Sequence, residues 1–135
     1  MRCASHAMDE PSPGLSRFVK GECDPDNFPH GDHVRMAFEM LLRHSFPKTA
    51  LHYSSALRKM AARAGRPEAY HETITLAFLS LIAERADGAG AEDYETFARE
   101  NPDLLDRRVL QRWYDPARLA SDAARRTFLL PEPRP

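Results

Sequence analysis

The sequence contains only two cysteines, a single tryptophan and no long run of hydrophobic residues. Cys3 and Cys23 both lie near the N-terminus, so they cannot form a disulfide framework, and we expect a reducing, cytoplasmic setting. No apolar stretch approaches the roughly 18 residues that a membrane-spanning helix needs. The N-terminus also has no apolar segment typical of a secretory signal. These absences predict a protein without a membrane partner.

Neither sign of charge dominates the chain. It has 19 lysines and arginines against 20 aspartates and glutamates, and the two kinds are interspersed. A nucleic-acid-binding surface needs clustered basic residues, so we expect no nucleic-acid partner. The 135 residues, 42% of them hydrophobic, are enough to build one buried core. We therefore predict one globular domain that acts on a small-molecule substrate, and a homodimer stays open as its assembly state.

Helical periodicity is the main structural signal. Apolar residues recur three and four positions apart, as in the stripe of Val34, Phe38 and Leu41, and no segment alternates as a strand does. Short breaks that contain proline or glycine separate three long periodic segments. The predicted long helices span residues 30–44, 48–64 and 68–85, with a loop at 87–90. Shorter helices are expected near residues 14–21, 91–100, 102–112 and 116–127.

These elements predict an all-α fold, a compact single-domain bundle of three long antiparallel helices with shorter C-terminal helices packed across them. The domain is expected to span residues 14–135. Residues 1–13 have the composition of a disordered lead, and two origins stay open for their first part. They are a cloning remnant that ends before Met8, or a native extension.

Three histidines are the strongest chemical signal. His30 and His33 stand three residues apart, so one helical turn can direct both toward one point. His71 lies at the start of the third long segment. Because short connections make consecutive helices antiparallel, the starts of the first and third helices share one end of the bundle. Three imidazoles there predict a metal site with an open coordination position, the pattern of catalytic zinc.

Other residues near these histidines suggest roles in a reaction. Glu72 is a candidate proton acceptor with Tyr70 next in line, and Thr75 and Arg125 are candidate substrate contacts. The alternative for Glu72 is a first-turn acid that the helix dipole favours. Histidines near a helix start are also often only hydrogen-bonded. A basic cluster at the end of the second helix is expected either to attract an anionic substrate or simply to match the helix dipole. Its members are Arg58, Lys59, Arg63 and Arg66.

Residues 28–37 read Phe-Pro-His-Gly-Asp-His-Val-Arg-Met-Ala, and residues 70–75 read Tyr-His-Glu-Thr-Ile-Thr. These motifs resemble those of a group of small uncharacterised bacterial helical proteins. Residues 119–128 resemble the closing segment of that group, and the resemblance covers most of residues 18–131. It implies a compact single domain with a His-x-x-His plus His pattern at His30, His33 and His71. It implies no particular activity.

The sequence therefore favours a small metal-dependent enzyme of the hydrolase or lyase type that acts on a polar metabolite. One divalent transition metal is expected at His30, His33 and His71, with zinc favoured over iron or copper. The first alternative is an oxygenase that uses iron or copper at the same site. The second is a non-catalytic helical module that binds a ligand or partner, in which the histidines are structural. The substrate and the reaction class stay open.

Overall fold

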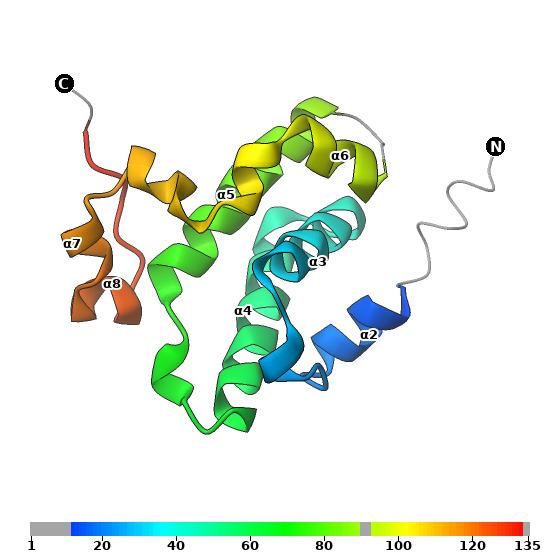
Figure 1. The fold of residues 1–135 in the computed structure, drawn as a ribbon, viewed down its shortest axis with the longest axis horizontal. Helices are drawn as coiled ribbons and strands as arrows, with labels where there is room; N and C mark the ends of the chain where they lie inside the picture. Colours follow the sequence, from blue (N-terminus) through cyan, green and yellow to red (C-terminus); the bar gives the residue numbers. More distant parts are fainter. Residues whose placement is uncertain (1–11, 90–92, 134–135) are drawn as a thin grey trace.

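The computed structural model describes residues 12–89 and 93–133, and within them the chain is helical without strands (Figure 1). The all-α prediction is confirmed. Residues 1–11, which hold most of the expected lead with Cys3 and Met8, lie outside the described residues, as do Gly90 and Ala91. The α-helices are α2 (Pro13–Val19), α3 (His30–Arg43), α4 (Phe46–Arg63), α5 (Glu72–Ala89), α6 (Tyr94–Glu100), α7 (Pro116–Leu119) and α8 (Asp122–Arg126). The 3₁₀ helices are η1 (Pro25–Asn27), η2 (Pro67–Ala69), η3 (Pro102–Leu105) and η4 (Arg107–Arg112).

Helices α3, α4 and α5 contact one another and carry most of the core. Phe38 of α3 stacks on Phe97 of α6, with ring centroids 4.5 Å apart, and both side chains are fully buried.

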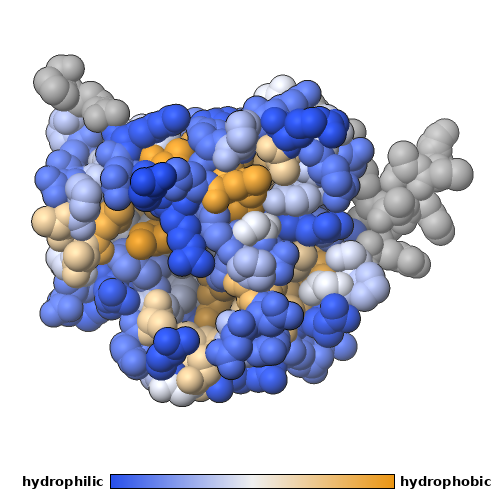
Figure 2. Space-filling view, in the orientation of Figure 1, coloured by the Kyte–Doolittle hydropathy of each residue, from blue (hydrophilic) through white to orange (hydrophobic). Residues whose placement is uncertain are grey.

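Figure 2 shows a mainly hydrophilic face on which hydrophobic residues appear in recesses near its middle. None of the helices in residues 12–89 and 93–133 is both long and apolar enough to cross a membrane.

The end of α4 has the hydrogen-bond pattern of a Schellman motif. Gly65 has a φ of +74°, a conformation that glycine adopts without strain. Its amide donates to the Ala62 carbonyl at 3.0 Å, and the Arg66 amide donates to the Ala61 carbonyl at 3.0 Å. These bonds satisfy two carbonyls that the helix end leaves free. They also fix where Arg66 leaves the helix and η2 begins.

The third long helix has different limits from those predicted. It begins at Glu72 instead of residue 68, because η2 and a short extended segment come first. The loop predicted to begin at Asp87 is wrong over Asp87–Ala89, which continue α5. Ala86 still packs against the core, so the helix extends beyond the last predicted turn despite the cost of about 1 kcal/mol for a glycine inside a helix.

Two of the three short helices predicted after residue 90 are each divided in the structure. Asp106 separates η3 from η4, and its carboxylate accepts from the Arg108 amide at 2.9 Å. Ser121 separates α7 from α8, and its hydroxyl accepts from the Ala124 amide at 3.2 Å. Both residue types favour helix N-caps, because their side-chain oxygens satisfy amides that a helix start leaves free. Each therefore starts a new short helix where one continuous helix was expected.

The C-terminal segment lies against the first half of α5 (Figure 1). Hydrogen bonds from a buried threonine hold it there. Thr73 of α5 donates its hydroxyl to the Thr127 carbonyl at 2.7 Å and accepts from the Leu129 amide at 3.1 Å. Tyr114 adds a bond from its hydroxyl to the Leu129 carbonyl at 2.8 Å. This contact brings the C-terminal segment close to the start of α5.

Candidate functional site

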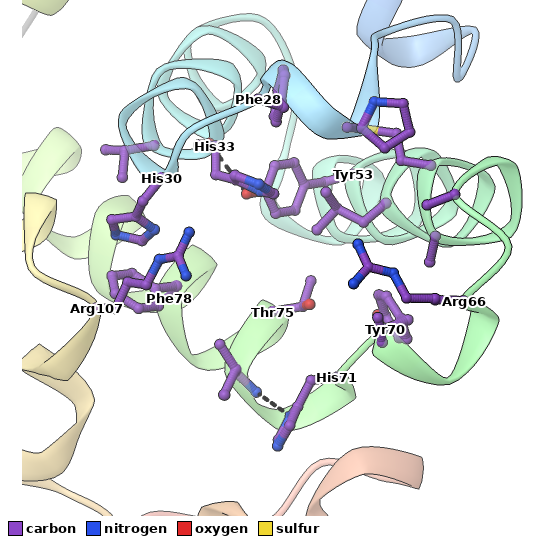
Figure 3. A pocket seen from close by; sticks show the side chains of 18 of the residues that line it. Phe28, His30, His33, Tyr53, Arg66, Tyr70, His71, Thr75, Phe78 and Arg107 are labelled. Atoms are coloured by element: carbon purple, nitrogen blue, oxygen red, sulfur yellow. Dashed lines mark hydrogen bonds between the residues drawn. The ribbon is translucent and has the colours of Figure 1, made fainter.

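A cavity of about 410 Å³ lies between α3, α4 and α5 (Figure 3). Residues before α3 and around η2 close parts of its wall, and Arg107 of η4 completes it. The structure brings all three predicted histidines, His30, His33 and His71, to the lining of this one cavity. Its volume falls in the range of small-molecule sites.

His71 serves as the N-cap of α5. Its Nδ1 accepts from the Ile74 amide at 3.1 Å, which satisfies one of the amides that the first helical turn leaves free. Its Nε2 lies 2.7 Å from the Leu119 carbonyl oxygen. Because a carbonyl only accepts, Nε2 carries the proton in this arrangement. Both ring nitrogens of His71 therefore have protein partners.

His30 lies at the start of α3, where its Nε2 donates to the Leu104 carbonyl at 3.0 Å. Its ring packs edge-on against Phe78, with centroids 4.9 Å apart. Burial lowers the pKa of His30, and the positive charge of Arg107 lowers it further against the hydrogen bond to Leu104. His30 is therefore neutral at neutral pH.

His33 is the more strongly perturbed member of the pair. Burial lowers its pKa to about 4, and electrostatic interaction with His30 and with the positively charged Arg107 acts in the same direction. A hydrogen bond to the Phe28 carbonyl opposes them. The ring also packs edge-on against the Phe28 ring, with centroids 4.7 Å apart. At neutral pH, His33 therefore offers the cavity an uncharged, polar imidazole.

The structure does not gather the three imidazoles around one point. Among the described residues, no group of three or more histidine, cysteine or acidic side chains is placed to hold a metal ion. His30 and His33 have ring centroids 6.4 Å apart, while the His71 ring turns toward the C-terminal segment (Figure 3). A metal on His71 would have to displace the Ile74 amide or the Leu119 carbonyl. Metal binding by this chain stays a prediction.

Glu72 and Tyr70 interact with each other beside the cavity. The Tyr70 hydroxyl donates to Glu72 Oε1 at 2.7 Å, and Arg58 Nη2 donates to the same oxygen at 3.1 Å. The Arg58 guanidinium lies 4.3 Å from the centre of the Tyr70 ring. Burial, together with Glu72, raises the pKa of Tyr70 to about 12. Tyr70 lines the cavity and Glu72 does not, so the observed contacts of Glu72 position Tyr70 and Arg58.

The two predicted substrate contacts lie in different places. Thr75 is buried and lines the cavity near its centre (Figure 3). Arg125 of α8 is not part of the lining, and it donates to the Glu68 carbonyl at 3.0 Å. The catalytic roles of Glu72 and Tyr70 and the substrate contacts of Thr75 and Arg125 stay predictions.

Among the polar residues of the lining, Tyr53 and Arg107 were not predicted to belong to the site. Tyr53 of α4 is buried, and its hydroxyl donates to the His33 backbone carbonyl at 3.1 Å. The helical periodicity of residues 48–64 is consistent with burial of Tyr53, but no sequence pattern indicates its hydrogen bond to the His33 carbonyl. Arg107 arrives from η4, 74 residues after His33 in the sequence. Such a contact depends on how the C-terminal helices pack, and no local pattern indicates it.

A scan against protein-family models and searches of curated proteins and of solved structures find no match to this chain. The resemblance of its motifs to small bacterial helical proteins stays a prediction. The function is therefore argued from the cavity and its residues.

Proposed function

We propose that this protein binds a small organic molecule with a largely apolar body in the cavity between α3, α4 and α5. The observation that carries this proposal is the composition of the wall. Aromatic rings of Phe28 and Phe78 stand beside the uncharged hydrogen-bonding groups of His33, Tyr70 and Thr75. Small-molecule sites combine an apolar wall with a few polar groups that orient the ligand in this way.

The contacts of the histidines support a binding role more than metal chemistry. His71 holds the start of α5 and the Leu119 carbonyl, and His30 holds the Leu104 carbonyl. The bonds to Leu119 and Leu104 each join the start of a long helix to a segment that follows later in the chain. The non-catalytic alternative, with structural histidines, is the closest of the sequence-based hypotheses to this geometry.

We also propose a cytoplasmic setting for this binding. Cys23, the described cysteine, is a free thiol. A thiol without a disulfide partner is compatible with a reducing compartment.

The binding proposal is tested with a neutral aromatic dye, N-phenyl-1-naphthylamine, whose fluorescence rises in apolar surroundings. Ala61 of α4 lines the cavity, whereas its neighbour Ala62 is exposed and does not. Ala61→Trp fills the cavity, so it should weaken dye binding by about tenfold or more, which corresponds to about 1.4 kcal/mol. Ala62→Trp is the matched control and should bind the dye like the wild type.

Two results would contradict the proposal. One is that the wild-type protein does not bind the dye. The other is that Ala61→Trp binds it as tightly as Ala62→Trp while both variants keep the helical circular dichroism spectrum of the wild type.

A further inference from the structure

Two arginines on the cavity wall differ from most arginines of the chain. Arginines elsewhere bind carboxylates or carbonyls, as Arg85 binds Asp103 at 2.9 Å and Arg63 binds the Gly21 carbonyl at 2.8 Å. Arg66 and Arg107 line the cavity, and neither guanidinium has a hydrogen bond or ion pair to another residue of 12–89 and 93–133. Two donors of this strength thus border a small-molecule cavity without an acceptor from those residues.

The cavity wall contains no carboxylate among the described residues, so its formal charge is positive. Asp106, the acid next to Arg107 in sequence, is paired with Arg108. Arg108 donates from Nε and Nη2 to the Asp106 carboxylate, both at 3.2 Å. At the opposite side, Glu72 is held by Arg58 and Tyr70. Asp106 and Glu72 therefore both have arginine partners outside the cavity wall.

The two guanidinium groups face each other across the cavity. In Figure 3, Arg107 extends between His30 and Phe78 toward the interior, and Arg66 extends inward from the wall near Tyr70. Arg107 lies close enough to His30 and His33 for its charge to affect both rings. An anion beside Arg107 would neutralise that charge next to two rings that burial keeps uncharged. Charge-assisted hydrogen bonds, such as those between a guanidinium and an anion, are stronger than hydrogen bonds between neutral groups.

We infer that the ligand is an amphipathic organic anion, whose acidic group pairs with Arg107 beside His30 and His33 while Arg66 gives a second positive contact across the cavity. This inference rests on the proposed binding function and names the class of its ligand. The acidic group is an oxyanion, because a planar guanidinium matches the paired oxygens of a carboxylate, phosphate or sulfonate. The apolar part of the ligand lies against Phe28 and Phe78.

The test uses two dyes with the same rings and different charge. One is 8-anilinonaphthalene-1-sulfonate, an aromatic anion, and the other is N-phenyl-1-naphthylamine, which lacks the sulfonate. Both are titrated at one ionic strength into the wild type, Arg107→Gln, Arg66→Gln and Arg126→Gln. Arg126 is an exposed residue of α8 outside the cavity wall, without a partner among the described residues, so its variant is a matched control for the loss of one charge.

Arg107→Gln should raise the Kd of the anionic dye by about tenfold, as expected for one lost charge-assisted pair. Arg66→Gln should raise it by a smaller factor, and Arg126→Gln should leave it within about twofold of the wild type. The Kd of the neutral dye should stay within about twofold in all three variants, since it has no charge to pair. Arg107→Lys keeps the charge and should retain part of the binding of the anionic dye.

Equal effects of Arg107→Gln and Arg126→Gln on the anionic dye would overturn the inference, because a general change of net charge would then explain both. It also fails if the anionic dye binds no more tightly than the neutral one. In that case the proposed binding function still stands, provided that the neutral dye binds and Ala61→Trp weakens it. If neither dye binds the wild type, both proposals fail together.

Discussion

The first turn of α3 and the cap position of α5 each carry a histidine that lines the same cavity, yet the two histidines have different roles. At α5, the side chain of His71 caps the helix and binds the Leu119 carbonyl, so its nitrogens are fully used within the protein. At α3, Pro29 occupies the cap position without a side-chain bond, and His33 lies one turn inside the helix. Its ring is partly buried, packs against Phe28 and lies close to Arg107. The same residue type is therefore structural where its ring caps a helix and bonds a distant carbonyl, and it lines the cavity where it lies one turn inside the helix.

The largest expected effect comes from removing the His71 ring that caps α5. His71→Ala should lower the free energy of unfolding by about 3 kcal/mol, because it removes a helix cap and leaves the Leu119 carbonyl without its donor. His71→Asn restores a capping side chain and should recover about 1 kcal/mol of the loss. Urea denaturation followed by circular dichroism measures both. His52→Ala, at an exposed position of α4, is the control and should change stability by less than about 0.5 kcal/mol.

The same variant also decides between the capping role and the predicted metal site. Elemental analysis of untagged wild-type protein and His71→Ala should give the same metal content, because His71 has no free nitrogen. A stoichiometric metal in the wild type that disappears in His71→Ala would contradict the capping account and support the three-histidine metal site.

The next largest effect is the pH dependence of stability that His33 of α3 should cause. His33 has a pKa of about 4 in the folded protein against 6.5 as the ordinary value, so between these pH values the unfolded chain binds a proton that the folded one does not. The stability that depends on a neutral His33 is fully present above pH 6.5 and is lost as the pH falls through 4. The loss is on the order of 2–3 kcal/mol. His30, whose pKa is also lowered, adds to it in the same direction.

His33→Gln removes the titrating group, so the difference in stability between this variant and the wild type should shrink as the pH falls from 7 to 4. Urea denaturation at several pH values measures this difference, and His52→Gln serves as the control. A difference that stays constant with pH would show that His33 is accessible to protons in the folded protein, and it would remove the contrast with His71.

The smallest expected effect concerns the hydrogen bond that holds the His33 backbone in place. Tyr53→Phe removes the hydroxyl that donates to the His33 carbonyl and should cost about 1 kcal/mol in the free energy of unfolding. Amide hydrogen exchange should rise mainly in the first turns of α3, which this bond anchors to α4. Uniform exchange throughout the chain would instead indicate a general loss of packing around the buried ring.

Local patterns predicted the positions of α3 and α4 within two residues, because apolar periodicity and the break at Ser45-Phe46-Pro47 are properties of neighbouring residues. The start of α5 was missed because the capping atom is a histidine nitrogen, and histidine is not among the usual N-cap residues. The gathering of three histidines at one cavity followed from short connections between helices. Their hydrogen-bond partners did not, since Leu104 and Leu119 come from distant C-terminal segments whose packing no local pattern encodes.

The central claim is that the cavity between α3, α4 and α5 is the ligand site, and chemical-shift mapping tests it most directly. The competing location is a smaller hollow of about 180 Å³ next to Trp113 and Phe128. Titration of ¹⁵N-labelled protein with N-phenyl-1-naphthylamine should move the amide signals of Val34, Ala61 and Thr75 and leave the Trp113 indole signal in place. Shifts concentrated at Trp113 and Phe128, with those of the cavity wall unchanged, would contradict the claim.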